Sequence, residues 1–403
     1  MESPKSDSSK RNTALITDPK DLEEVVALIE EAGVFGLDLE FIPERTYFPI
    51  ICLVQIAVQD KVFLVDPIEL TDQQIHWKTV ADSRIVKVLH AASQDLMIIF
   101  QRSGLIPKNI FDTQIAAGFL GLGYPAGYGK LLAALFDLNL SKTESFTDWQ
   151  ARPLSRSQIE YAIDDALHLI PLYERLQSEL ETRKRLDWVV EECKHYEQDS
   201  YYIKESGREF LRVKGAQGLN RRKLAVLQAV CLWREAEAKR TDRPARSVIN
   251  DNIMLELAKK PPSSIEDIQR IRGIRSDQLS HWGRKVVKVI EEANQIADKD
   301  CPQWPSGRAP SKADVLIADV LYTVLKIRAL DLEIAPELIA TRDELQGLAK
   351  IGRDIPEANH LQSDNMAGDE GQNALTFGWR RRLAGNELIK VLRGTPIKVT
   401  ISE

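Results

Sequence analysis

Hydrophobic and polar positions in the first half of the chain alternate between the periods of helices and strands. Apolar residues recur at helical spacing from Asp18 to Ala32, and residues 34–41 then form an apolar run typical of a buried strand. Two more apolar runs, 50–58 and 62–65, are split by three polar residues, which predicts a β-hairpin. Short runs at 85–89 and 110–111 predict further strands, each followed by a helix. This order predicts an α/β domain with a mixed sheet covered by helices.

The second half has the helical period almost to its end, beginning with a long helix expected near 156–183. Breaks occur at Lys214-Gly215-Ala216 and in the Pro/Gly-rich stretch 301–307. We therefore expect a disordered tail at 1–12, an α/β domain at 13–208 and a helical domain at 212–296. A linker at 297–310 and a second helical domain at 311–399 would complete the chain.

Length and composition are those of a soluble protein with several domains. The 403 residues suggest two or three folding units, and 43% are hydrophobic without any long apolar run. No amino-terminal stretch resembles a signal peptide, so we expect a cytoplasmic protein that does not associate with membranes. Four scattered cysteines without a nearby histidine at zinc-finger spacing predict neither disulfides nor structural zinc.

Charge is distributed unevenly along the chain. The overall net charge of −6 would argue mildly against a nucleic-acid partner if it were spread evenly. Residues 212–296 contain 18 Lys and Arg against 10 Asp and Glu, a net +8, so the remainder carries −14. An acidic part joined to a basic part suits an enzyme that binds metal ions at one end and phosphates at the other. Ordinary variation in surface charge is the alternative.

Asp38 and Glu40 form the first candidate chemical motif. They lie two residues apart on a predicted strand, so both side chains project from the same face of the sheet. Their oxygens are ligands that hard cations such as Mg²⁺ prefer. The alternative is an exposed acidic strand end.

Two further acidic positions follow. Asp95 stands where a predicted strand gives way to a helix, close after His90, although a first-turn helix acid and a packed core histidine are the simpler interpretations. Tyr161 and Asp165 share a helix face one turn apart, which would let the phenol orient a water molecule beside the carboxylate. Asp164 is the rival to Asp165 for this role.

Together these residues resemble, in order and local context, the acids of the DEDDy 3′→5′ exonucleases, and ribonuclease D in particular. The resemblance covers about residues 14–205. Leu39 and Gln94 depart from the family pattern, where threonine and glutamate are frequent. The segments that carry the resemblance are Asp38–Pro49 with Leu53–Ile56, His90–Leu96, Phe111–Ala117, and Asp148–Leu154 with Gln158–Asp165.

The basic region resembles the helical HRDC domain that RecQ-type helicases share with ribonuclease D. The matching segments are Leu227–Glu237, Pro244–Arg246 and Ile271–Ile274. By position, 311–399 would be a second such domain, and each region contains a late Trp-Gly or Gly-Trp pair (Trp282-Gly283, Gly378-Trp379). The resemblance thus implies a ribonuclease H-like exonuclease domain followed by one or two all-α HRDC-type domains.

The function implied is 3′→5′ trimming of tRNA precursors and other small structured RNAs, with release of nucleoside 5′-monophosphates. Two divalent ions, Mg²⁺ or Mn²⁺, would lie about 4 Å apart and clamp the scissile phosphate. Asp38 would bridge them, Glu40 and Asp165 would complete one site, Asp95 would bind the other ion, and Tyr161 would align the attacking water. A helicase-associated type of DNA exonuclease and an inactive nucleic-acid-binding scaffold remain the alternatives.

RNA is the expected partner, and no obligate protein partner is evident. Basic residues of the helical domain would neutralise phosphates without reading sequence. The residues expected at RNA are Phe41, Arg45, Tyr47, Gln55, His90, Lys142, Trp149 and Arg152 in the first domain, and Lys214, Arg221, Arg222, Lys223, Arg243 and Arg246 in the second.

Overall fold

The computed structural model describes residues 13–70, 75–140, 147–203, 207–274, 276–305, 311–351 and 373–396. The chain divides into two compact units. Unit 1 comprises Met1–Glu40, Cys52–Tyr201 and Ala309–Glu403, and unit 2 comprises Phe41–Ile51 and Tyr202–Arg308. The predicted tail at 1–12, Lys142 and part of the predicted linker lie outside the described residues.

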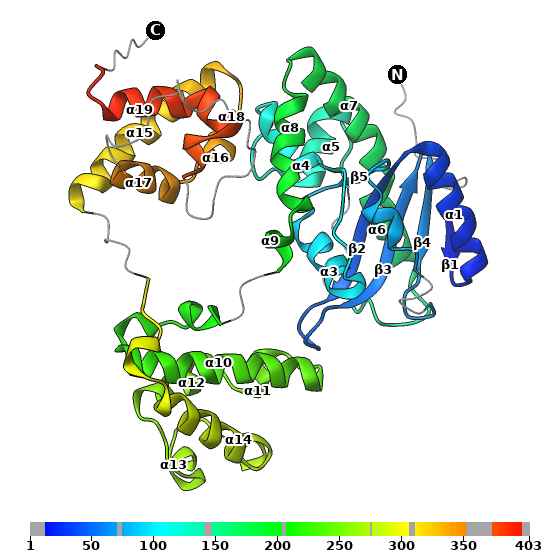
Figure 1. The fold of residues 1–403 in the computed structure, drawn as a ribbon. Coiled ribbons are helices and arrows are strands. Elements are labelled where there is room, and N and C mark those ends of the chain that lie inside the picture. The colour runs from blue at the N-terminus through cyan, green and yellow to red at the C-terminus, as the bar shows by residue number, and fades with distance from the viewer. Residues whose placement is uncertain are drawn as a thin grey trace. The chain divides into compact units, whose positions relative to one another are not determined.

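Unit 1 is built on a six-stranded sheet with the order β1-β4-β3-β2-β5-β6 (Figure 1). Strands β3 and β4 form the predicted antiparallel hairpin, whereas β1–β4, β2–β5 and β5–β6 pair in parallel. The predicted mixed sheet is therefore confirmed. The strands are β1 (Thr13–Ile16), β2 (Val34–Ile42), β3 (Ile50–Val58), β4 (Lys61–Val65), β5 (Val86–Leu89) and β6 (Ile110–Asp112).

Helix α1 (Pro19–Ala32) illustrates how local sequence sets the element boundaries. Asp18 caps its start by accepting a hydrogen bond from the Lys20 N–H, and Gly33 ends it with a φ of 67°. Leu22 and Ile29 of α1 border the same small cavity as Phe35 of β2, so α1 covers that face of the sheet. The other helices that follow the first strands are α2 (Lys78–Ala81), α3 (Ser93–Ser103), α4 (Thr113–Phe119) and α5 (Tyr128–Phe136).

The prediction of a single long helix near 156–183 is wrong, because the chain forms two helices there, α6 (Arg156–Leu167) and α7 (Leu169–Thr182). The break falls at His168, whose φ and ψ of −98° and 4° are not helical. Pro171 explains it: proline has no N–H to donate, and its ring collides with the carbonyl four residues earlier, that of Leu167. After α7 come α8 (Leu186–Cys193), a 3₁₀ turn (Lys194–Glu197) and α9 (Asp199–Tyr202).

Unit 2 contains a helical array around one apolar core. Trp282 is 4% exposed in this core, and its ring centroid lies 6.4 Å from that of Trp233. Short 3₁₀ turns at Glu209–Arg212 and Ala216–Gly218 precede the array, in agreement with the break predicted near 214–216. The helices are α10 (Arg221–Thr241), α11 (Ala245–Val248), α12 (Asp251–Lys259), α13 (Ile265–Gln269) and α14 (Ser276–Gln295).

The carboxy-terminal helices belong to unit 1 and pack on α4 and α8. Trp379 is 1% exposed and meets Phe119 edge to face, with ring centroids 4.7 Å apart. Arg380 binds both carboxylate oxygens of Glu192 at 2.6 and 2.7 Å. The elements are α15 (Lys312–Asp331), α16 (Pro336–Ile339), α17 (Arg342–Ile351), α18 (Gly378–Arg380), a π-helical turn (Arg381–Gly385) and α19 (Asn386–Leu392). No helix within the described residues is both long and apolar enough to cross a membrane.

Candidate active site

Strand β2 presents two carboxylates on one face, as its sequence predicts. Leu37 and Leu39 are buried on the opposite face, at 2% and 5% exposure, whereas Asp38 and Glu40 are only partly buried. Gly36 lies on the carboxylate face. A Cβ at Gly36 would come within 2.9 Å of the Leu169 Cβ, so only glycine lets α7 pack this closely on β2.

Helix α6 supplies the third carboxylate. Ser155 and Gln158 form the capping box that fixes the start of α6, and the Gln158 amide also donates to the Asp148 carbonyl at 3.1 Å. Two turns beyond the cap, Tyr161 hydrogen-bonds the side chain of Asp165. The start of α6 therefore determines where this pair projects.

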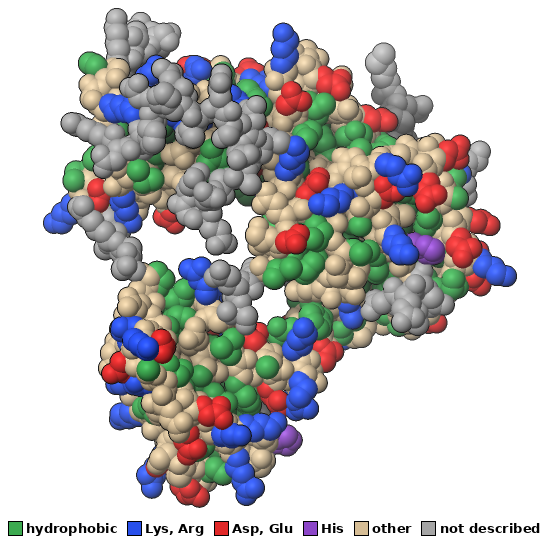
Figure 2. Space-filling view, viewed as in Figure 1, with side chains coloured by type: hydrophobic (Ala, Val, Ile, Leu, Met, Phe, Trp, Pro, Cys, Tyr) green, Lys and Arg blue, Asp and Glu red, His purple; other side chains and the backbone are tan. Residues whose placement is uncertain are grey.

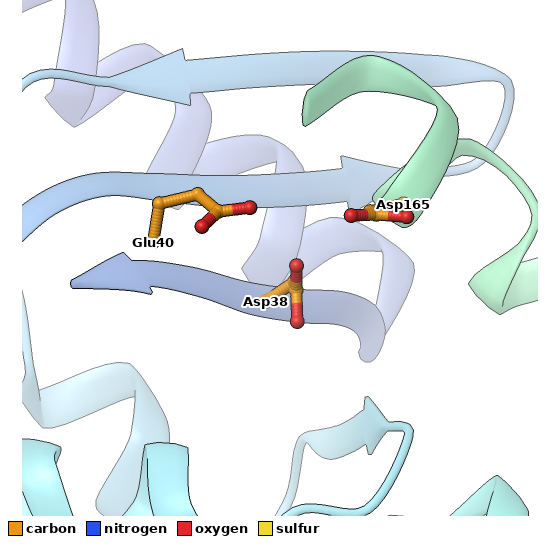
Figure 3. A group of neighbouring side chains, drawn as sticks. All are labelled: Asp38, Glu40 and Asp165. Atoms are coloured by element: carbon orange, nitrogen blue, oxygen red, sulfur yellow. The ribbon is translucent and has the colours of Figure 1, made fainter. Parts of the chain in front are cut away.

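Asp38, Glu40 and Asp165 converge on one point. One carboxylate oxygen from each lies within 4.8 Å of the other two, and Figure 3 shows the side chains turned toward one another from β2 and α6. Asp165, and not its neighbour Asp164, is the member of this group. The fold thus brings the predicted pair on β2 together with the predicted acid of α6, more than 120 residues later in the sequence.

Burial and mutual repulsion raise the pKa of these carboxyls. The pKa of Asp38 is raised well above its usual value, first by burial and then by the charges of Asp95, Asp165 and Glu40. Burial raises the pKa of Glu40 to about 8, with further contributions from Asp165 and Asp95. The pKa of Asp165 rises only to about 6, because the hydrogen bond from Tyr161 partly offsets burial.

Asp95 lies next to this group without joining it. It is the third residue of α3, is 8% exposed, and its charge raises the pKa of both Asp38 and Glu40. Burial and then the neighbouring charge of Asp112 raise the pKa of Asp95 to about 7. The predicted fourth acid is therefore close to the other three but outside their 4.8 Å cluster.

The donor set of this cluster fits divalent cations. It consists of carboxylate oxygens, which are the ligands of hard ions such as Mg²⁺ and Mn²⁺. A bound cation would also relieve the repulsion that raises the pKa of these acids. Asp38, Glu40 and Asp165 would hold such an ion. Asp95 lies near enough for its charge to raise the pKa of Asp38 and Glu40, so it could take part as well.

Three motif residues expected at RNA are largely enclosed by the domain. Gln55 is fully buried, and neither polar atom of its side chain has a hydrogen-bond partner. Trp149 is 3% exposed, with its ring centroid 6.0 Å from that of Tyr161. The Nδ1 atom of His90 lies 2.9 Å from the Thr113 hydroxyl.

The Arg152 guanidinium binds groups of its own domain. It binds the buried carboxylate of Asp66 at 2.6 and 2.8 Å. The same group donates to the carbonyls of Cys52, Trp149 and Ala151. These contacts tie the end of β4 to the segment before α6, which favours a structural role over contact with RNA.

The segment after Glu40 groups with unit 2. The backbone N–H of Tyr47 donates to Asp242 at 3.1 Å, and its hydroxyl lies 3.4 Å from Glu235. Lys239 lies over the ring of Phe48, 5.7 Å from its centroid. The remaining predicted residues of this segment differ in exposure: Phe41 is partly buried and Arg45 is exposed.

The six predicted basic residues of unit 2 fall into two groups. Arg221 donates to the carbonyls of Lys299 and Cys301. Arg222 donates to the carbonyls of Asn294 and Ile296, at and just beyond the end of α14, and pairs with Asp298. Both guanidiniums thus bind backbone carbonyls of residues 294–301. The other four are Lys214, Arg243 and Arg246, which are exposed, and Lys223, which is partly buried.

Tyr128 is a site neighbour that the sequence analysis missed. It begins α5 inside the glycine-rich stretch 121–129, whose composition is typical of a flexible connection. Burial raises the pKa of its phenol, and the charges of Asp165 and Asp38 raise it further, so the hydroxyl is near the carboxylates. No local pattern marks it, because its partners lie far away in the sequence.

Comparisons with known proteins agree with this geometry. A family model described as a 3′-5′ exonuclease matches residues 13–181, and one described as an HRDC domain matches residues 223–290. The ribonuclease D of Zymomonas mobilis is 33% identical over 391 residues, which cover 94% of each chain. That of Gluconacetobacter diazotrophicus is 33% identical over 386 residues, covering 94% of this chain and 93% of the other.

The chain belongs to the ribonuclease D family. It is therefore a hydrolytic 3′→5′ exoribonuclease that uses divalent metal ions and acts on RNA. The crystal structure of Escherichia coli RNase D, described as an exoribonuclease involved in structured RNA processing, has a TM-score of 0.81 at 25% identity. The match covers 96% of this chain and 100% of that one. The predicted family and the predicted fold class are both confirmed.

Proposed function

We propose that this ribonuclease D trims the 3′ ends of tRNA precursors and other small structured RNAs, releasing nucleoside 5′-monophosphates. The observation that carries the proposal is the convergence of Asp38, Glu40 and Asp165, with Asp95 beside them. The E. coli relative, described as acting in structured RNA processing, supports the substrate class. The proposed place of action is the cytoplasm, where such RNAs are made.

The four acids and Tyr161 are the proposed catalytic residues. When bound, two Mg²⁺ or Mn²⁺ ions supply positive charge that activates water and neutralises the scissile phosphate. Asp38 would contact both ions, Glu40 and Asp165 would complete one site, and Asp95 the other. Each acid must be ionised to act as a ligand.

Tyr161 is the proposed guide for the attacking water. Its phenol already donates to Asp165, so its oxygen is fixed beside the cluster and can accept a hydrogen bond from water. Water attacks phosphorus, the bond to the 3′-oxygen breaks, and a proton passes to that oxygen. The products are a nucleoside 5′-monophosphate and an RNA one residue shorter with a free 3′-hydroxyl.

RNA contacts are proposed mainly for exposed basic residues. Lys214, Arg243 and Arg246 of unit 2 are exposed, and Figure 2 shows Lys and Arg side chains spread over the visible face of α10–α14 with acids between them. Lys223 and Arg45 are proposed to assist. The rings of Trp149 and His90 lie 6.0 and 5.4 Å from those of Tyr161 and Tyr128. With the buried Gln55, they are proposed to shape the pocket for the terminal nucleotide.

Residues 311–399 are proposed to form a second HRDC-like array. In unit 2 a 4-residue helix begins 24 residues after the start of the long helix, at Ala245 after Arg221. The carboxy-terminal array repeats this spacing at Pro336 after Lys312. In both arrays the next helix begins 6 residues later, and a buried tryptophan follows.

The decisive experiment is digestion of 5′-labelled RNA and DNA of identical sequence with Mg²⁺, Mn²⁺ or EDTA. We expect a ladder that shortens from the 3′ end of RNA, faster than for DNA, because the 2′-hydroxyl offers an additional contact at the terminal nucleotide. EDTA should stop it. Preferential digestion of DNA would indicate the DNA exonuclease alternative. A tRNA precursor should be trimmed to a discrete product, and complete degradation of it would contradict the proposed substrate class.

A further inference from the structure

Asp112 is a buried carboxylate that the proposed chemistry does not use. It ends β6, is 1% exposed, and caps α4 by accepting a hydrogen bond from the Gln114 N–H at 2.8 Å. Three more donors reach it from distant segments: the N–H groups of Ala91 at 3.0 Å and Ala92 at 2.9 Å, and the Tyr196 hydroxyl at 3.1 Å. Each carboxylate oxygen thus accepts two hydrogen bonds.

Asp112 also binds the backbone just before the start of α3. The residue at the cap position of α3 is Ala92, which has no side-chain acceptor. Asp112 accepts hydrogen bonds from the N–H groups of Ala91 and Ala92, and so fixes the backbone immediately before α3. Ala91 has a φ of 59°, in the left-handed region that a residue with a Cβ seldom adopts. One carboxylate therefore caps α4 and also holds the turn before α3 in an unfavourable backbone conformation.

The residue after Asp112 holds the other end of the same turn. The Thr113 hydroxyl is fully buried, donates to the Leu89 carbonyl at 3.1 Å, and lies 2.9 Å from the Nδ1 atom of His90. Parallel pairing of β5 with β6 places Leu89 opposite Asp112. Residues 112 and 113 thus fix the backbone from 89 to 92.

The consequence concerns Asp95, the third residue of α3. Asp38, Glu40 and Asp165 come from β2 and α6, whereas Asp95 depends on α3 for its position. A shift or rotation at the start of α3 would move Asp95 without moving the other three. The turn at 90–92 is the link that sets this distance.

We propose that Asp112 is a positioning residue for the metal site, holding the 90–92 turn so that Asp95 faces the cluster of Asp38, Glu40 and Asp165. The inference rests on the proposed function of these acids. Tyr196, 4% exposed, supports Asp112 from the 3₁₀ turn after α8. Removing partners of a metal ligand that lie outside the ligand shell typically weakens metal binding 10- to 100-fold.

The test uses Asp112→Asn and Asp112→Ser in the full chain. Asparagine keeps the size but places an NH₂ group against N–H donors, whereas serine can still cap α4 but is too short to serve Ala91 and Ala92. We expect both variants to bind Mn²⁺ about 10-fold more weakly by calorimetry. Their kcat should fall while KM for RNA changes little, and raised Mn²⁺ should partly restore kcat.

Asp18→Ala is the control, because it removes a helix cap of the same domain at α1. It should lower thermal stability without changing Mn²⁺ affinity. Unaltered Mn²⁺ affinity in folded Asp112 variants would overturn the positioning role. If those variants do not fold, Tyr196→Phe decides: it should weaken Mn²⁺ binding in the same direction, and wild-type affinity would overturn the proposal. Failure of the wild-type chain to bind Mn²⁺ would instead contradict the metal site itself.

Discussion

The Tyr161 phenol hydrogen-bonds the Asp165 carboxylate one turn further along α6, and this bond lowers the pKa of Asp165 against the effect of burial. Tyr161→Phe should therefore leave a folded protein in which the pKa of Asp165 is higher and the water is less well aligned. We expect kcat to fall about 100-fold, the lower range for a positioned acid–base group. The acidic limb of the pH–rate profile should move to higher pH. Wild-type kcat in this variant would exclude Tyr161 from the reaction.

Asp38→Asn and Asp165→Asn should each abolish nuclease activity. Without metal, their thermal stability should be unchanged or raised, because each substitution removes a charge that burial and neighbouring carboxylates disfavour. Assays of RNA digestion and thermal unfolding in EDTA test both statements. Asp164→Asn is the matched control, since Asp164 adjoins Asp165 but is not a member of the cluster. Its activity should stay within a few-fold of wild type.

The same repulsion predicts how stability depends on pH. Folding raises the pKa of Glu40 to about 8, of Asp95 to about 7 and of Asp165 to about 6. Between the usual carboxyl pKa and these values, the folded state binds more protons than the unfolded state. The free energy of unfolding of the metal-free protein should therefore fall as the pH rises from about 6.5 to about 8.

Two buried basic side chains, His90 and Lys87, limit the pH range in which this fall in stability is expected. Burial lowers the pKa of His90, which opposes the trend below its usual pKa near 6.5, and lowers the pKa of Lys87 to about 8, which opposes it above that pH. Urea unfolding in EDTA at several pH values measures the slope. Saturating Mg²⁺ should flatten it, and so should Glu40→Gln. A slope of the opposite sign in EDTA would contradict the raised pKa values.

The sequence predicted the chemistry of this site better than its surroundings. The period of a strand was enough to place Asp38 and Glu40 on one face, and the family order of acids led to Asp165. Spacing alone could not choose between Asp164 and Asp165, since neighbouring helix positions differ by only about 100°. Sequence spacing could not show that Arg152 binds a carboxylate within the domain, because that carboxylate, Asp66, lies 86 residues away in the sequence.

The packing of the carboxy-terminal helices could not be predicted from the sequence, for the same reason. The Pro/Gly-rich stretch at 301–307 predicts a linker before a second helical domain, and the helices that follow it group with the exonuclease fold in one compact unit. The contacts that join them, Trp379 with Phe119 and Arg380 with Glu192, connect residues 260 and 188 positions apart in the sequence. Local periodicity carries no information about such long-range pairs.

Arg380→Ala should loosen this attachment. Glu192 would lose a bidentate partner in a mostly buried setting, and hydrogen bonds to charged groups contribute about 1.5–3 kcal/mol each. We expect the variant to unfold at a lower urea concentration than the wild type, and its carboxy-terminal helices to be cut faster by proteases. Arg382→Ala is the control: Arg382 pairs with Glu191 at 3.1 Å but is 58% exposed, so its loss should cost less than about 1 kcal/mol. Equal effects of the two substitutions would contradict the assigned role of Arg380.

Salt dependence of RNA binding separates the two groups of basic residues in unit 2. Replacing Lys214, Arg243 and Arg246 together by alanine should raise KM on a tRNA precursor and leave kcat nearly unchanged, because phosphate contacts supply binding and not transition-state chemistry. The slope of log affinity against log salt should become shallower by about 0.7 for each single-strand phosphate that the variant no longer neutralises, roughly 2 in total.

Arg222→Ala is the counterpart that should behave in the opposite way. Its guanidinium donates to the carbonyls of Asn294 and Ile296, so its loss should lower thermal stability and leave the salt slope unchanged. Substitution is a cleaner probe than truncation at residue 212, which would also remove Trp379 and Arg380 from the exonuclease fold. If the triple variant keeps both its KM and its salt slope, the excess of Lys and Arg is an ordinary solvated surface. The helical array would then bind something other than the RNA backbone.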